Sequence, residues 1–123
     1  MPTKEQIEAM VKTFKLQDWE IDVQEDETIT DCARTLLIFN DYKACIKLKK
    51  QNSDIEQEKS LIHELLHLIF RDAYDIFDAQ CKDEFAKEYC QKQHERAIEK
   101  TSKIIYSLLH SESEVTNETL RNI

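Results

Sequence analysis

Apolar residues recur at helical spacing at the start of the chain and at strand spacing soon after it. Between Thr3 and Lys15 they fall three or four positions apart, which predicts an amphipathic helix. Apolar and polar residues then alternate from Trp19 to Gln24, and two more strands are predicted from Ala33 to Phe39 and from Tyr42 to Leu48. Asn40-Asp41 predicts a two-residue turn between these last two strands, because both residue types tolerate a left-handed backbone. We expect Tyr42 to lie on the buried face of its strand.

The second half of the chain is predicted to be mainly helical. A capping box at residues 53–56 starts a helix that we expect to run from Asp54 to Arg71. The acidic, irregular pattern from Asp72 to Lys82 predicts a loop or short turns, and a long helix follows from about Asp83 to His110. The polar tail from Ser111 to Ile123 is expected to be poorly ordered.

Length and composition place these elements in one α+β domain. With 123 residues and a hydrophobic fraction of 41%, the chain can build a single core. We therefore predict one domain over residues 1–123. In it, a small, three-stranded, mainly antiparallel sheet packs on the N-terminal helix, the middle helix and the long C-terminal helix.

Charge and composition argue against several classes of function. The formal net charge of −8 disfavours nucleic acid or an anionic membrane as a partner, and the absence of glycine excludes glycine-rich phosphate loops. No apolar run reaches the roughly 20 residues that span a bilayer, and the N-terminus has no signal-peptide pattern. The four cysteines form no Cys-x-x-Cys pair. We expect them to be reduced thiols in the cytoplasm, with a four-cysteine zinc site as the alternative.

The clearest chemistry lies in the sequence HELLH at residues 63–67. On a helix, His63 and His67 lie one turn apart on the same face and can bind one metal ion, while Glu64 beside them can act as a general base. The stretch from Leu61 to Phe70 is otherwise apolar, which predicts a buried helix whose polar groups need a partner. We therefore predict a zinc ion bound by both histidines. The alternative is that they are core residues without a metal.

A third protein ligand must come from outside this motif, because catalytic zinc usually has three and leaves the fourth position open. Glu95 and Glu99 are four positions apart and share one face of the long helix. We predict that Glu95 binds the metal and that Glu99 accepts a hydrogen bond from a ligating imidazole. Other possible ligands are His94, Asp75 and Asp78. The alternative without a metal is a solvent-exposed helix whose glutamates pair with lysines.

This arrangement resembles a known family of enzymes. A strand that contains Ala44-Cys45-Ile46, the HELLH helix and then a glutamate-bearing helix are similar to the small bacterial and phage-associated zincins of the ImmA/IrrE type. In related gluzincins the third ligand and its supporting acid form a Glu-x-x-x-Asp pattern, which residues 95–99 match with Glu99 in place of Asp. The resemblance covers Trp19 to Leu109. It implies a minimal zincin-like fold and a zinc metallopeptidase that cleaves protein substrates such as repressors.

Motif and resemblance together predict hydrolysis of a peptide bond. Glu64 would take a proton from a zinc-activated water and pass it to the leaving amine. The strand from Tyr42 to Leu48, which directly precedes the motif helix, is expected to pair with an extended substrate. Four residues could donate a hydrogen bond to the oxyanion: Tyr74, Tyr89, His94 and Tyr106.

Two other functions stay open at this stage. The first is a catalytically silent, zinc-binding regulatory domain of a phage or mobile element. Glu64 argues against it, because metal binding alone does not need this acid. The second is an interaction module without a metal, in which HELLH belongs to the core and the acidic surface contacts a partner. The metal content of the purified protein distinguishes the second from the rest.

Overall fold

Three helices and three strands make up residues 1–38 and 41–121, the part of the chain that this computed structural model describes. The α+β class, the three-stranded sheet and the long C-terminal helix predicted from the sequence are confirmed. In chain order the elements are α1 (Lys4–Thr13), β1 (Glu20–Asp26), β2 (Ala33–Ile38), β3 (Lys43–Lys49), α2 (Asp54–Gln80) and α3 (Glu84–Arg121).

The sheet is mixed, with β3 in the middle and the order β1-β3-β2. β2 and β3 pair in antiparallel orientation as expected, but β1 and β3 run parallel, with Ile21 opposite Ala44. Alternate residues of β3, namely Ala44, Ile46 and Leu48, are buried. Because β3 is paired on both sides, β1 and β2 are the two edges of the sheet.

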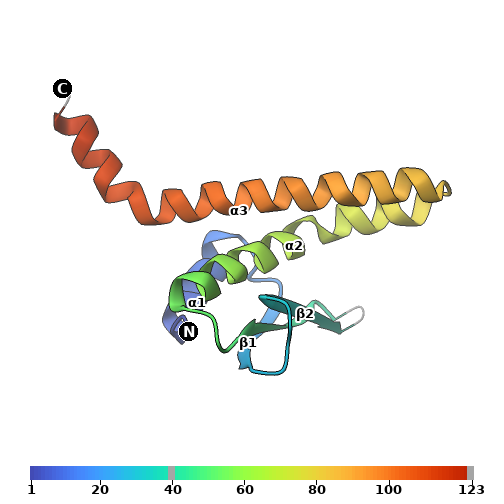
Figure 1. Cartoon of the computed structure of the whole chain (residues 1–123), viewed down its shortest axis with the longest axis horizontal. Coiled ribbons are helices and arrows are strands. Elements are labelled where there is room, and N and C mark those ends of the chain that lie inside the picture. The colour runs from blue at the N-terminus through green and yellow to red at the C-terminus, as the bar shows by residue number, and fades with distance from the viewer. Residues whose placement is uncertain (39–40, 122–123) are drawn as a thin grey trace.

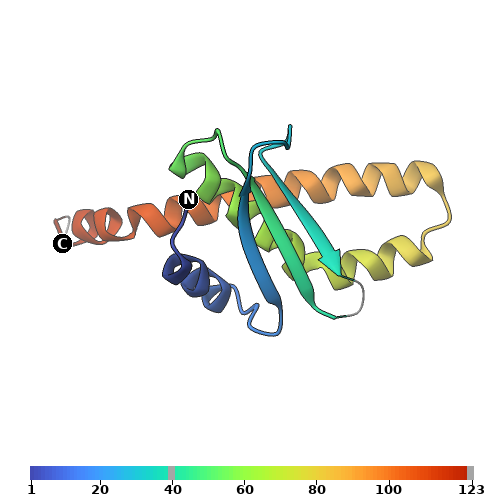
Figure 2. The same cartoon turned by 90° about the horizontal axis from the view of Figure 1, so that it is seen from below.

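Helix α2 lies between the sheet and α3 (Figure 1; Figure 2). Leu61 and Leu65 are fully buried in the cluster that includes the buried residues of β3. A second face of α2, with Ile62 and Leu66, packs with Ile98 of α3. Burying such side chains contributes about 1.5–3 kcal/mol each, which fixes the rotation of α2 about its axis. A third face of α2 points into the space between the sheet and α3, here called the seam. This face carries the HELLH histidines.

Both long helices extend further than predicted. The loop expected from Asp72 to Lys82 is wrong for most of its length, since α2 continues to Gln80. This stretch has no glycine or proline to end a helix, and its acidic residues are tolerated at exposed helix positions. Here α2 and α3 continue past the sheet (Figure 2). Ile69 and Phe70, which the apolar run predicted to be buried, are 40% and 44% exposed for this reason.

The predicted helix starts are confirmed. Thr3 and Ser53 each accept a hydrogen bond from the backbone N–H three residues on, at 3.2 Å, and both capping boxes are complete. Tyr42 is not on a buried strand face: it has a left-handed backbone with φ of 50° and is 47% exposed. Residues 39–40, which belong to the predicted second strand and turn, lie outside the described residues.

The long C-terminal helix, predicted to end near His110, continues to Arg121, and residues 122–123 of the predicted tail lie outside the described part. Among the helices described here, none combines the length and apolar character needed to cross a membrane.

Candidate metal centre

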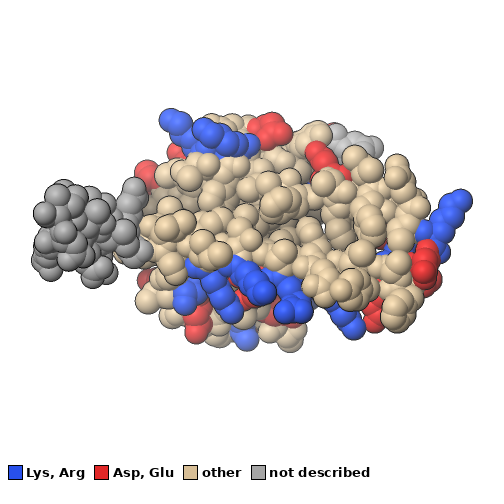
Figure 3. Space-filling model, turned by 90° about the horizontal axis from the view of Figure 1, so that it is seen from above, with Lys and Arg blue, Asp and Glu red and all other residues tan. Residues whose placement is uncertain are grey.

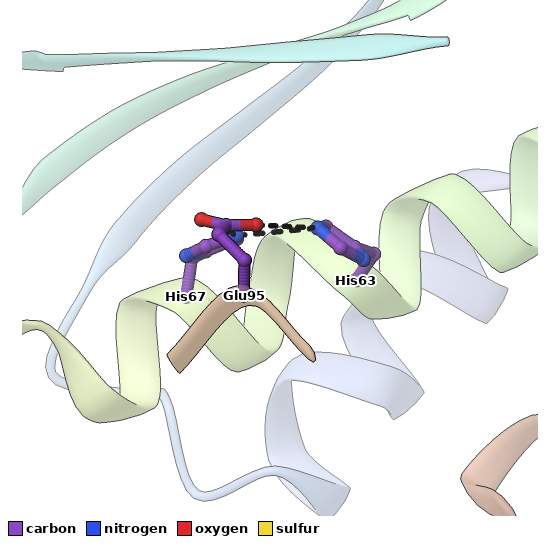
Figure 4. Close-up of side chains that lie close together, drawn as sticks. All are labelled: His63, His67 and Glu95. Atoms are coloured by element: carbon purple, nitrogen blue, oxygen red, sulfur yellow. Dashed lines mark hydrogen bonds and ion pairs between the residues drawn. The ribbon is translucent and has the colours of Figure 1, made fainter. Parts of the chain in front are cut away.

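His63 and His67 lie one turn apart on the third face of α2 and point the same way (Figure 4). Their Nε2 atoms are 3.2 Å apart, and their side chains are 23% and 29% exposed. Apolar packing on the two neighbouring faces of α2 therefore holds two imidazole nitrogens next to one another at the protein surface.

Glu95 reaches the same point from α3 (Figure 4). Its Oε1 lies 3.4 Å from His67 Nε2, and its Oε2 lies 3.9 Å from His63 Nε2. The buried Ile98, three positions further along α3, packs on α2 and so turns the Glu95 face of α3 toward the histidines. In the described part of the chain, these three residues are the one group of three or more His, Cys, Asp or Glu side chains whose ligand atoms all lie within 4.8 Å.

This donor set fits a zinc ion. Zinc–nitrogen and zinc–oxygen bonds are about 2.0–2.2 Å long, so the ligand atoms of a tetrahedral site lie about 3.3 Å apart. The two Nε2 atoms are 3.2 Å apart, and the two oxygens of Glu95 lie 3.4 Å from His67 Nε2 and 3.9 Å from His63 Nε2. With one ligand atom from each residue, all three lie within 4.8 Å of one another. Two imidazoles and one carboxylate are also a usual catalytic zinc set.

Glu99, for which the sequence predicts a hydrogen bond from a ligating imidazole, lies on the other side of His63. Its Oε2 is 3.1 Å from His63 Nδ1, and its Oε1 is 3.7 Å from Lys103 Nζ. A carboxylate at this position favours a proton on Nδ1, which leaves the lone pair on Nε2, facing the cluster. The lysine pair expected for a solvent-exposed Glu99 therefore exists, but together with the histidine contact and not in place of it.

The pKa of His67 is lowered from its ordinary value, mainly because burial disfavours the charged ring. The nearby Glu95 and Glu64 act in the opposite direction, while His63 and His94 add to the lowering. At pH 7 the imidazole of His67 is therefore neutral, and this is the form that binds a metal.

Glu64 contacts the sheet through a residue that the sequence analysis missed. Thr35 of β2 donates a hydrogen bond from its Oγ1 to Glu64 Oε2, at 2.6 Å. The two residues are 29 positions apart, and threonine is common in strands. No sequence motif could have indicated this contact.

Glu64 also borders two recesses that meet at the histidines. The first, of about 490 Å³, lies toward the start of α2; among the residues that line it are Ala33, Lys59, His63, Glu99, Lys103 and Tyr106. The second, of about 290 Å³, lies further along α2; its lining includes Thr35, Leu37, His67, Tyr74 and His94. A molecule lying across the histidines would occupy both.

The other predicted ligands lie outside the group of three. The ring of His94 stacks on Tyr74, with centres 4.7 Å apart, and lies 5.9 Å from the ring of His67. Asp75 pairs with Arg71 at 3.2 Å, and Asp78 belongs to no candidate metal group among the described residues. The four cysteines are free, and none belongs to such a group in that part of the chain.

The strand next to this site is β2 and not β3, so the predicted substrate-pairing strand is wrong: β3 has no free edge. The Lys49 N–H donates a hydrogen bond to the Cys32 carbonyl at 3.0 Å, so Cys32 and Lys49 are a hydrogen-bonded pair. This pair determines which residues of the antiparallel ladder between β2 and β3 are hydrogen-bonded. Hydrogen-bonded and non-hydrogen-bonded pairs alternate, so Ala33, Thr35 and Leu37 direct their backbone N–H and C=O groups to the free edge. These same residues line the two recesses.

No protein-family model matches the chain, and no curated protein and no solved structure matches it significantly.

We expect the purified protein to bind close to one zinc ion per chain. Replacing both histidines, His63→Ala with His67→Ala, should abolish this binding, because only one ligand is left. Zinc should then raise the melting temperature of the parent but not of the variant. Elemental analysis and thermal unfolding measure these effects. His110→Ala removes a histidine outside the site and serves as the control. Full zinc binding by the double variant would refute the assignment of these ligands.

Glu95 and Glu99 should differ in how strongly they affect zinc binding. Glu99→Ala removes a group that only orients His63, and should weaken zinc binding by about 10–100-fold. Glu95→Ala removes a direct ligand and should weaken it more. A chelator titration of the two variants, with Glu88→Ala as a surface control on the same helix, gives the order. The reverse order would make Glu99 the ligand.

Proposed function

We propose that this chain is a zinc-dependent metallo-endopeptidase that resembles the small zincins and cleaves a protein or peptide. The observation that carries the proposal is the meeting of His63, His67 and Glu95 at zinc-binding distances with Glu64 beside them. The HELLH motif requires a third ligand from another part of the chain, but the motif itself does not determine where Glu95 lies. Motif and fold therefore support the same chemistry independently.

Catalysis explains Glu64 better than metal binding alone does. A zinc site needs only its ligands and the groups that orient them, and Glu64 is neither. It is partly buried, its carboxylate is held by Thr35, and it borders both recesses. This is the position expected of a general base, which must touch both the metal's water and a bound substrate.

The reaction would be the addition of water to a peptide bond. Bound zinc supplies a Lewis acid that polarises the carbonyl and activates water. Glu64 takes one proton from the water as the new carbon–oxygen bond forms, and gives it to the amide nitrogen as the carbon–nitrogen bond breaks. The hydrogen bond from Thr35 Oγ1 to Glu64 Oε2 holds the carboxylate in place for this transfer. His94 and Tyr74 in the second recess, or Tyr106 in the first, would donate to the oxyanion. Tyr89 is 60% exposed and lines neither recess.

An extended substrate would add to the free edge of β2. The backbone groups of Ala33, Thr35 and Leu37 would pair with the substrate backbone. This pairing would position a peptide bond next to Glu64 whatever side chains the substrate carries. Repressor-like proteins are the substrates that the family resemblance implies. The four free cysteines are consistent with activity in a reducing cytoplasm.

Glu64→Gln should retain zinc and the fold, but lose peptidase activity by at least about a hundredfold, because the amide cannot take a proton. Cleavage of an unstructured protein such as casein, followed by mass spectrometry, measures the loss, and zinc content shows that the site is intact. A zinc-loaded parent without activity would favour the silent regulatory domain. Equal activity in parent and variant would mean that Glu64 is not the base.

Thr35→Val should lower the turnover number by about tenfold to a hundredfold without changing zinc content, because a hydrogen bond to a charged group contributes roughly 1.5–3 kcal/mol. Thr35→Ser keeps the hydroxyl and should restore activity. Steady-state kinetics of the two variants test whether Thr35 positions Glu64. If both lose activity equally, the methyl group matters and the hydrogen bond does not.

A further inference from the structure

Helix α3 is the outer layer of the molecule and is attached mainly through α2. The sheet packs on one side of α2 and α3 on the other, and the contacts of α3 with the other elements are concentrated on α2 (Figure 1). Figure 3 views the molecule from the side of α3, where uncharged residues cover much of the surface. An element that touches a domain along one side only can separate from it without unfolding the remainder.

Few side chains of α3 are buried. Over residues 84–110, the part of α3 whose side chains are described, Ile98 is 1% exposed and Ser102 is 6% exposed, and no other residue is buried. Ile105 and Tyr106 are partly buried beside Ile98. The shorter α2 buries more residues, namely Gln57, Leu61, Ile62, Leu65, Leu66 and Leu68. Because packing of an apolar face supplies most of the stability of a helix in a protein, α3 is held less firmly than α2.

Other contacts between α2 and α3 lie closer to the surface. His110 Nε2 lies 2.7 Å from Glu58 Oε1, but 47% of the His110 side chain is exposed. The ring of His94 stacks on Tyr74, and both residues are only half-buried. Exposed pairs of this kind contribute little to stability. They therefore add little to the attachment of α3.

The metal centre is the place where a ligand could join the two helices. His63 and His67 belong to α2, whereas Glu95 belongs to α3. The set of three ligands exists only while α3 lies on α2. Linkage then requires one common factor: docking of α3 raises zinc affinity by as much as zinc favours docking. Loss of a group that only orients a ligand weakens zinc binding by about 10–100-fold, so this factor for a direct ligand is at least about tenfold.

We propose that zinc holds α3 on α2. In the metal-free protein, α3 opens locally from a body made of α1, the sheet and α2, and bound zinc suppresses this opening. The inference rests on the metal centre of the proposed function and not on peptidase activity.

This coupling links zinc to the recess beside Glu64. Glu99, Ser102, Lys103 and Tyr106 of α3 form one wall of the first recess. The recess is complete only while α3 is docked. Zinc therefore has two effects in the proposed enzyme, because it supplies the chemistry and also closes one wall of the space that a substrate would occupy.

The test is hydrogen–deuterium exchange of the full chain, followed by mass spectrometry, without metal and with excess zinc. Residues 96–106 report on α3, and residues 43–49 of β3 report on the opening of the sheet. In the metal-free protein, the α3 amides should exchange faster than the β3 amides, because a helix without tertiary packing is only marginally stable. Zinc should slow the exchange of α3 at least about tenfold.

Two variants with two zinc ligands each separate joining of the helices from zinc binding alone. Glu95→Ala leaves both ligands on α2, so zinc should no longer slow the exchange of α3. His67→Ala leaves one ligand on each helix, so excess zinc should still slow it, though less than in the parent. Glu88→Ala on α3 should respond like the parent. Elemental analysis shows that each protein is loaded with zinc.

Equal exchange of α3 and β3 in the metal-free protein, or an equal effect of zinc in Glu95→Ala and His67→Ala, would overturn the proposal. A parent that binds no zinc would refute the metal centre and this proposal with it. Cleavage of casein is measured separately. Zinc-dependent protection of α3 without cleavage would leave the proposal and refute the peptidase. Cleavage by a zinc-loaded parent whose α3 does not respond to zinc would do the reverse.

Discussion

The packing of α2 on two sides is the constraint on which the rest of this structure depends. Leu61 and Leu65 are buried toward the sheet, and Ile62 and Leu66 toward α3. A rotation of α2 by one residue, about 100°, would expose one of these pairs and cost several kcal/mol. The helix therefore cannot turn, and the face that carries the histidines must lie in the seam. Apolar contacts fix the geometry of a site to which they contribute no ligand.

The seam concentrates negative charge that the protein only partly balances. Glu64 and Glu95 lie near His67, whose pKa burial lowers, so this ring does not supply a compensating proton at pH 7. Glu99 is balanced in part by Lys103. The two Nε2 atoms, 3.2 Å apart, also direct lone pairs toward the same space when both protons lie on Nδ1. A divalent cation removes both sources of repulsion at once, which is why we favour a metal over a network of hydrogen bonds.

The sequence predicted local features well and long-range ones poorly. Capping boxes, strand alternation and the HELLH face depend on neighbours within a few residues, and all are found in the structure. The position of Glu95 and Glu99 near the histidines could be predicted because HELLH needs a third ligand from elsewhere in the chain, and the spacing of these two glutamates places both on one helix face. The parallel pairing of β1 with β3 and the contact of Thr35 with Glu64 depend on how distant segments meet, for which no local pattern exists. The end of α2 is predicted too early because acidic residues at exposed positions lower helix propensity only slightly and do not end a helix.

The contact between Thr35 and Glu64 joins the edge of the sheet to the chemistry of the site. Thr35 directs its backbone groups to the free edge of β2 and its hydroxyl to the carboxylate. A peptide that pairs with this edge therefore binds to the same residue that orients the base. Any shift of β2 on binding moves the hydroxyl with it, so the position of the substrate and the orientation of Glu64 are not independent. A side chain on α2 alone could not achieve this coupling, because α2 is held rigidly by its two packed faces. In the reaction that we propose, the sheet, and not the helix that carries Glu64, would be the element through which a bound substrate influences this carboxylate.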